Sequence, residues 1–255
     1  MKEEEILKKT KIFGRLKQVL HKIKSEQKKI YLKKFEEIAG FSVWIVNGKF
    51  IRKNICEDFV NFGQHYHFKF IPKNEFWIDK EARHHEMYFY VEHLLIENRL
   101  MAQGTNYSRA YFKEISAEKK ERARSSVFKK LKNFFKKKKP LNKIHKKLWI
   151  NNKDKLSVWI VNGEVVRDFL DVAFTEGSHG YIDSFIPKDE IWIDDDIFVS
   201  ERKIILIHEL HERRMMKNKK MKYLQAHKLA TIIEDYCRKH PKKVNKILEK
   251  EFCLV

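Results

Sequence analysis

The densest group of metal-binding and proton-transferring side chains lies in residues 204–214, whose sequence is IILIHELHERR. Four apolar residues lead into His208, Glu209 and Glu212. On a helix, residues four apart share a face, so His208 and Glu212 can hold one metal ion between them. Glu209 would then stand beside that ion, where a general base for an attacking water is needed. The spacing predicts a metal-assisted hydrolytic site.

A second helix, predicted over residues 223–237, carries His227 and Glu234, which lie seven residues apart and therefore on one face. His227 would complete a set of two histidines and one carboxylate, which leaves zinc an open position for water or substrate. Glu234 is expected to orient one of the ligands. His179, expected on a loop, is a candidate to stabilise an oxyanion or to replace a ligand; the alternative is a loop histidine in water.

This arrangement resembles the active-site helix of the zincin metallopeptidases, whose signature is H-E-x-x-H with a third ligand from further along the chain. His208 and Glu209 match the first two positions. Glu212 stands where the family has its second histidine, so the motif here reads H-E-x-x-E. The resemblance covers about residues 200–240. It implies a zinc cofactor and hydrolysis of a peptide or another carbonyl substrate.

A structural role fits the same residues. Charged side chains at the end of an apolar helical run commonly form its solvated face, and a His–Glu pair one turn apart can be a surface hydrogen bond. Arg213 and Arg214 are expected on the solvent side or paired with the acidic run 194–196.

The composition limits the classes of protein to which this chain can belong. The 255 residues are 43% hydrophobic, enough for a real core, and carry a formal charge of +20 with a pI near 9.7. Three separated cysteines make no CxxC pair, and the apolar runs are too short for a membrane span. We therefore expect a cytoplasmic protein, and the excess positive charge favours polyanionic partners.

Two basic segments are predicted to be helical, residues 11–38 and residues 126–139. Each has an apolar stripe that can pack on its own domain while the lysines face water, or that can lie on a nucleic acid or an anionic membrane. For nucleic acid, the candidate contacts are Lys129, Lys130, Lys132, Lys136, Lys137, Lys138 and Lys139.

A tandem repeat organises the chain. The heptapeptide SVWIVNG occurs at residues 42–48 and again at residues 157–163, and further matches follow at the same offset. We therefore predict an α+β protein built by duplication of one unit, with repeats at 1–122 and 123–255. Each repeat is expected to contain a basic helix, a small antiparallel sheet and two further helices.

The local patterns predict how each sheet is built. Asn47 and Gly48 suit a type I′ turn, so residues 50–52 should return as a second strand. The segment FIPKNEFWID, residues 70–79, is expected to form a strand, a turn and another strand. Trp77 alternates with acidic residues, which favours a core anchor over a ligand platform.

The two repeats have different residues at the positions of the candidate site. The first repeat keeps His93 and Glu97, the counterparts of His208 and Glu212, but has Leu94 for Glu209, Ile96 for His211 and Tyr111 for His227. The leading hypothesis is a metal-dependent hydrolase in the second repeat with a degenerate first repeat. Two non-enzymatic hypotheses remain beside it: a nucleic-acid-binding protein and an assembly scaffold.

Overall fold

The computed structural model describes residues 16–136, 140–152 and 155–254. The chain divides into two compact units, Met1–Glu114 and Ile115–Val255. The division falls within helix α5, whereas the repeat boundary expected from the sequence lies at the end of that helix.

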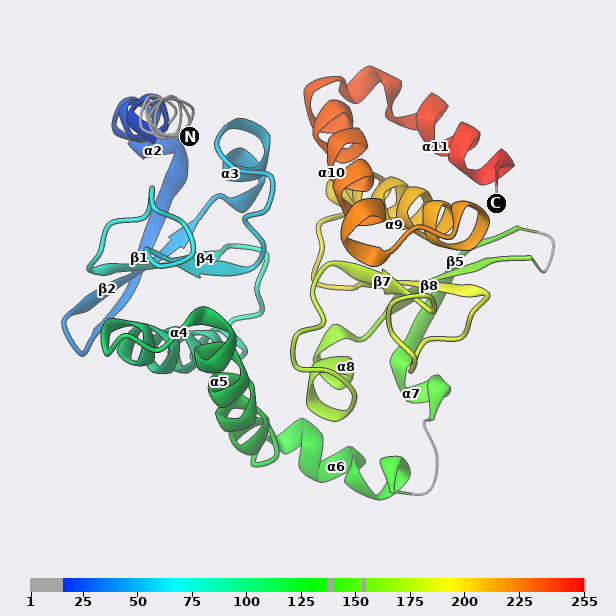
Figure 1. The fold of residues 1–255 in the computed structure, drawn as a ribbon. Coiled ribbons are helices and arrows are strands. Elements are labelled where there is room, and N and C mark those ends of the chain that lie inside the picture. Colours follow the sequence, from blue (N-terminus) through cyan, green and yellow to red (C-terminus); the bar gives the residue numbers. More distant parts are fainter. Residues whose placement is uncertain (1–15, 137–139, 153–154, 255) are drawn as a thin grey trace, which may run out of the picture. The chain divides into compact units, whose positions relative to one another are not determined.

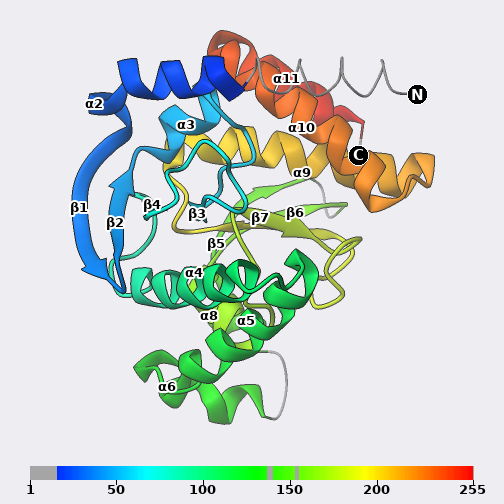
Figure 2. The same ribbon diagram turned by 60° about the vertical axis from the view of Figure 1, so that its left-hand side comes forward.

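The first unit places its sheet between helices. Residues 16–25 are helical. The following elements are α2 (Gln27–Ile30), β1 (Tyr31–Ile38), β2 (Phe41–Val46), α3 (Gly48–Asn54), β3 (Phe62–Gln64), β4 (Glu75–Asp79), α4 (Met87–Ala102) and α5 (Tyr107–Arg122), the last of which runs into the second unit (Figures 1 and 2).

The second unit repeats this order and adds helices at its end. Its elements are α6 (Ser126–Phe135), α7 (Leu141–Ile144), β5 (His145–Asn151), β6 (Ser157–Val161), α8 (Gly163–Phe169), β7 (Gly177–His179), β8 (Glu190–Asp194), α9 (Val199–Lys219), α10 (Tyr223–Lys239), the 3-10 turn η1 (Pro241–Lys243) and α11 (Val244–Cys253).

The two four-stranded sheets have the same strand order, β1-β2-β4-β3 and β5-β6-β8-β7. Their registers also correspond, since Trp44 pairs with Trp77 in the first sheet and Trp159 pairs with Trp192 in the second. The fold class is therefore α+β, with each sheet followed by helices.

The sheets are mixed, so the predicted all-antiparallel arrangement is wrong. The outer pairs are antiparallel, but β2 runs parallel to β4 and β6 runs parallel to β8. Parallel neighbours need a crossover connection, and helices α3 and α8 lie within those connections. The sequence pattern of short strands did not reveal the crossover.

The predicted hairpin at Asn47-Gly48 is also wrong, because a helix begins there. The Asn47 side chain accepts a hydrogen bond from the Phe50 N–H at 3.2 Å and caps α3. A Cβ on Gly48 would collide with the carboxylate of Asp79, so only glycine allows this close approach. The predicted return strand at 50–52 is therefore helical.

Three further boundaries differ from the predictions. The first basic helix ends at Ile30, and residues 31–38 form β1, whose turn into β2 uses Ala39 and Gly40 at positive φ. Residues 70–74 are irregular, so only the second half of FIPKNEFWID is a strand. Ser200 is of a residue type that favours the N-cap of a helix, but helix α9 begins earlier, after Phe198.

In the second unit, helices cover both faces of the sheet (Figure 1). Ile191 and Ile193 of β8 pack in a core with the apolar residues of α9, while Trp192 between them packs in a second core with α8. Trp192 is fully buried, and its Nε1–H donates to Glu190 at 2.6 Å. Successive side chains of β8 thus point to opposite faces of the sheet and enter two different cores, and α9 packs on one of these faces.

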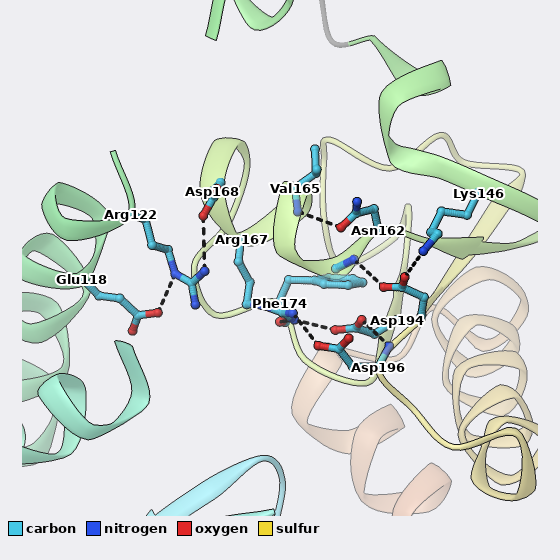
Figure 3. Close-up of polar contacts among 12 residues, drawn as sticks. Glu118, Arg122, Lys146, Asn162, Val165, Arg167, Asp168, Phe174, Asp194 and Asp196 are labelled. Carbon is cyan, nitrogen blue, oxygen red and sulfur yellow. Dashed lines mark hydrogen bonds and ion pairs between the residues drawn. The ribbon is translucent and has the colours of Figure 1, made fainter. Parts of the chain in front are cut away.

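A buried arginine binds acidic side chains at the end of each parallel strand pair. Arg167 of α8 donates to Asp194, to Asp196 at 3.1 Å and to the Phe174 carbonyl at 3.1 Å (Figure 3). Arg52 makes the equivalent contacts with Asp79, Glu81 and Phe59 in the first unit. The acidic run 194–196 therefore pairs with Arg167, and not with Arg213 or Arg214 as expected.

Candidate functional site

Three side chains from two helices converge in the second unit. His208 and Glu212 lie one turn apart on α9, and His227 projects from α10. The Nε2 atom of His208 is 3.2 Å from Nδ1 of His227 and 3.5 Å from Oε2 of Glu212. That carboxylate oxygen is 2.8 Å from Nδ1 of His227. These three atoms face one point, as a metal site requires.

Solvent reaches the group from one side. The side chain of Glu212 is 1% exposed and that of His208 is 10% exposed, whereas that of His227 is 42% exposed. The group is therefore covered by α9, and it is exposed to solvent at His227 of α10.

Glu234 stands behind His208. Its Oε2 lies 2.8 Å from Nδ1 of His208, so it accepts the Nδ1–H, and Nε2 is the ring nitrogen that faces His227 and Glu212. Arg238, on the next turn of α10, donates to the other carboxylate oxygen of Glu234 at 2.6 and 3.0 Å and also to Glu201. A buried chain of charges therefore fixes the orientation of His208.

His179 belongs to strand β7 and not to a loop as expected. It is fully buried, and its Nδ1 accepts the Tyr181 N–H at 3.2 Å. Its Nε2 faces Oε1 of Glu212 at 3.4 Å. Burial lowers the pKa of His179, against the opposing effect of Glu212. The neutral ring therefore carries its proton on Nε2, directed at Glu212, which makes it a partner of that carboxylate.

Glu209 lies beside the group and is 6% exposed. One ligand atom each from His179, Glu209 and Glu212 falls within 4.8 Å of the others. Oε2 of Glu209 is buried without a hydrogen-bond partner among the described residues. Burial raises the pKa of Glu209 to about 8, with Glu212 and Glu234 adding to the rise and His208 opposing it. Its carboxyl group is poised to exchange a proton near neutral pH.

The carboxylates also set the charge of His208. Burial favours its neutral form, but the hydrogen bonds to Glu212 and Glu234 outweigh burial and raise the pKa of His208 to about 10. Burial likewise favours a neutral Glu212, yet its three histidine neighbours lower the pKa of that carboxyl. Because a metal ligand must be unprotonated, an ion at this place has to displace the proton of His208.

The next histidine of α9 has another role. His211 lies 3.2 Å from Glu251 of α11, and Arg214 donates to the same carboxylate at 3.0 and 3.2 Å. These contacts fasten α11 to α9. Arg214 is therefore not solvent-facing, and the expectation for it is wrong.

Arg213 is also buried, contrary to expectation, with 2% of its surface exposed. Its Nη2 donates to the Lys188 carbonyl at 2.7 Å, and its guanidinium lies over the Tyr181 ring at 5.2 Å. Burial lowers the pKa of Arg213. The sequence analysis did not identify Arg213 as a candidate site residue. Comparison of the repeats could have done so, since the first repeat has Asn98 at this position.

The first unit fills the corresponding positions with different groups. Gln64, the counterpart of His179 at the end of β3, donates to Glu97 and accepts from Asn98 at 2.6 Å. His93 is 2.6 Å from Glu114, and Tyr111 stands at the position of His227. An amide and a phenol thus replace two imidazoles.

The candidate lysines on α6 point to solvent. Lys129, Lys130, Lys132 and Lys136 are exposed, while Lys137, Lys138 and Lys139 lie outside the described residues. The apolar stripe of α6 packs on the core of its own unit. Within the described part of the chain, every helix is too short or too polar to cross a lipid bilayer.

Comparison of the chain with protein-family models, with curated proteins and with solved structures finds no match in any of the three.

Proposed function

We propose that the second unit is a zinc-dependent hydrolase that acts on a peptide or another carbonyl substrate, with His208, Glu212 and His227 as the metal ligands. The observation that carries this proposal is the spacing of 2.8, 3.2 and 3.5 Å among their three inward-facing atoms. A single point can lie about 2.0–2.1 Å from all three, which is the bond length that zinc makes to imidazole nitrogen and carboxylate oxygen.

The surrounding carboxylate and imidazole support the same reading. Glu234 accepts the Nδ1–H of His208, the arrangement that fixes tautomer and ring orientation in histidine-bound zinc sites. His179 faces the second oxygen of Glu212, the one that does not point to the ligand group. Each of these two ligands therefore has a buried partner that holds it in place.

The chemistry follows from charge placement. A bound zinc ion would lower the pKa of water toward neutrality and polarise a carbonyl group. Glu209 would accept a proton from the attacking water and return it to the leaving group. Its raised pKa suits both directions of transfer. A nearby positive ion favours the ionised form of Glu209, which is the form that accepts the proton.

Both units descend from one duplicated unit in this proposal. The shared heptapeptide, strand order and register support a common origin. Because Leu94, Tyr111 and Gln64 replace a base and two imidazoles, the first unit serves as a structural partner that has lost the reaction.

Zinc titration tests the metal site. Protein stripped with a chelator should bind one zinc ion per chain and should melt at a higher temperature as zinc is added. His227→Ala should abolish both effects, whereas His240→Ala, at the exposed end of the same helix, should change neither. Absence of bound zinc and of any thermal gain would end the enzyme proposal.

The catalytic role of Glu209 has its own test. Glu209→Gln should keep zinc stoichiometry and lower the rate of hydrolysis of a mixed peptide pool by roughly 10²- to 10⁴-fold, as expected for loss of a general base. An unchanged rate in zinc-loaded E209Q would remove Glu209 from the mechanism.

Nucleic-acid binding is a second candidate function, favoured by one observation on α6. Its four exposed lysines, Lys129, Lys130, Lys132 and Lys136, make no ion pair in the described part of the chain, so their charge is available to phosphates. Binding to duplex DNA or RNA should weaken steeply as salt rises. A flat salt dependence would dispose of this candidate.

A further inference from the structure

Arg213 has more hydrogen-bonding capacity than its surroundings use. The residue is 2% exposed, and among the described residues Nε and Nη1 have no hydrogen-bond partner. In the described part of the chain, only Nη2 donates a hydrogen bond, to the Lys188 carbonyl. A buried cation left with free donors is costly unless an anion or a polar ligand meets it.

A second cation shares the same aromatic ring. Lys188 Nζ lies 4.9 Å from the centre of the Tyr181 ring, and the Arg213 guanidinium lies 5.2 Å from it. Among the described residues, neither side chain makes an ion pair with a carboxylate. Tyr181 and Lys188 both belong to the connection between β7 and β8. The Tyr181 ring therefore has two positive charges near it, Lys188 from the same connection and Arg213 from α9.

This group adjoins the candidate zinc site. The Tyr181 ring is 6.2 Å from that of His179, whose Nε2 faces Glu212, and Arg213 follows Glu212 on α9. Arg213 is thus linked to the ligand group through both the helix and the β7 strand.

The two repeats differ at Arg213 together with the site residues. Tyr181 and Lys188 have identical counterparts, Tyr66 and Lys73, in the first repeat. Arg213 is replaced there by Asn98, in the same repeat that has lost the counterparts of His179, Glu209 and His227. The arginine is present where the chemical groups are present, which a purely structural role does not require.

We propose that Arg213, supported by Lys188 and Tyr181, binds a carboxylate of the substrate. The substrate class is then a peptide or acylated amino acid with a free carboxylate near the bond that is cleaved. This inference rests on the proposed function, because it names the substrate of that hydrolase. Binding of an anion at Arg213 does not itself require zinc. The end of the guanidinium offers Nη1 and the second hydrogen of Nη2, a fork that matches two carboxylate oxygens.

Calorimetry on the full chain, with and without zinc, tests the site with N-acetylphenylalanine and its neutral analogue N-acetylphenylalanine amide. The acid should bind at least about tenfold more tightly than the amide, the difference expected from hydrogen bonds to a charged group. Arg213→Met should bring the two affinities within about twofold. Arg214→Met, whose parent side chain is already paired with Glu251, should keep the preference.

Equal affinities for acid and amide in the unaltered protein, or a preference that survives in R213M, would overturn the inference. Arg213→Lys guards against misfolding: it keeps the charge but loses the fork, so it should retain only part of the preference. Zinc binding without a carboxylate preference refutes this inference alone. A carboxylate preference without zinc binding refutes the hydrolase alone.

Discussion

At the scale of single residues, the second unit concentrates ionisable groups where burial would normally penalise them. His208, Glu212 and Glu234 are nine-tenths buried or more, yet each is held by an oppositely charged or hydrogen-bonding partner. Breaking one partner of such a group is costly because the other charge stays in a dry environment. The orientation of each proposed ligand is therefore set by its neighbours, and each neighbour can be tested separately.

Glu234→Gln should weaken zinc binding by about 10- to 100-fold, because the carboxylate that holds the Nδ1–H of His208 is replaced by a weaker acceptor. A chelator competition assay gives the dissociation constant. The matched control is Asp235→Asn, next on the same helix, where the side chain forms an exposed pair with Lys239. Equal zinc affinities for E234Q and D235N would contradict the assigned role.

Asp168 should give the second unit a pH-dependent stability. Burial raises the pKa of Asp168 to about 6 from its ordinary value of 3.8, although Arg122 at 3.3 Å opposes the rise (Figure 3). The folded state then holds a proton that the unfolded state releases, so stability from this group falls as pH rises from about 4 to 6.

Urea unfolding of the wild type and of Asp168→Asn at pH 4.5 and pH 6.5 measures this effect. The wild type should lose stability relative to the variant between the two pH values. Asp171→Asn, in the loop that follows α8, serves as the control and should track the wild type. A constant difference between D168N and the wild type would show that Asp168 does not titrate in this range.

At the scale of elements, the strand-to-helix junctions hold the parallel strands in place. Asn162 caps α8 by accepting the Val165 N–H at 3.3 Å, and Gly163 lets the helix start against the carboxylate of Asp194. Arg167, one turn further along, binds that same carboxylate (Figure 3). The heptapeptide that ends in Asn-Gly is therefore a helix start packed on an acidic strand end, which explains why both residues recur in both units.

Gly163→Ala should destabilise the second unit by about 2–3 kcal/mol, because the added methyl group collides with Asp194 and displaces it from Arg167. Asn162→Ala removes only the cap and should cost about 1 kcal/mol. Thermal or urea unfolding compares the two variants. A smaller decrease in the free energy of unfolding for G163A than for N162A would mean that the close contact with Asp194 is easily relieved.

At the scale of the whole molecule, one fold plan carries two different sets of polar groups. The two sheets share strand order and register, and each is followed by a helix with a His–Glu pair. In the first unit the amide of Gln64 donates to the buried carboxylate of Glu97, while in the second unit imidazoles surround the carboxylate of Glu212. If zinc binds only at His208, Glu212 and His227, its effect should be confined to the second unit.

Hydrogen exchange followed by mass spectrometry tests this confinement. Zinc should slow exchange in α9 and α10, whose side chains it would join, and should leave α4 and the sheet of the first unit unchanged. The first unit thus serves as an internal control in the same sample. Equal protection of α4 and α9 would place zinc elsewhere or in both units.

The sequence by itself determined the mixed α+β class, the repeated pattern and the candidate residues of the two helices. These features depend on local periodicity and on residue identity, which a linear chain displays directly. Residues such as His208 and Glu212 share a face through helical geometry alone, so their proximity needed no tertiary information.

Only the tertiary structure decided the parallel strand pairing, the burial of His179 and Arg213, and the approach of His227 to His208. Parallel pairing depends on a crossover between distant segments, and the turn-like signal of Asn-Gly was overridden by the packing of Gly48 and Gly163 against acidic strand ends. Contacts between residues far apart in the chain arise from the packing of whole elements, and local sequence carries no record of their distance or burial.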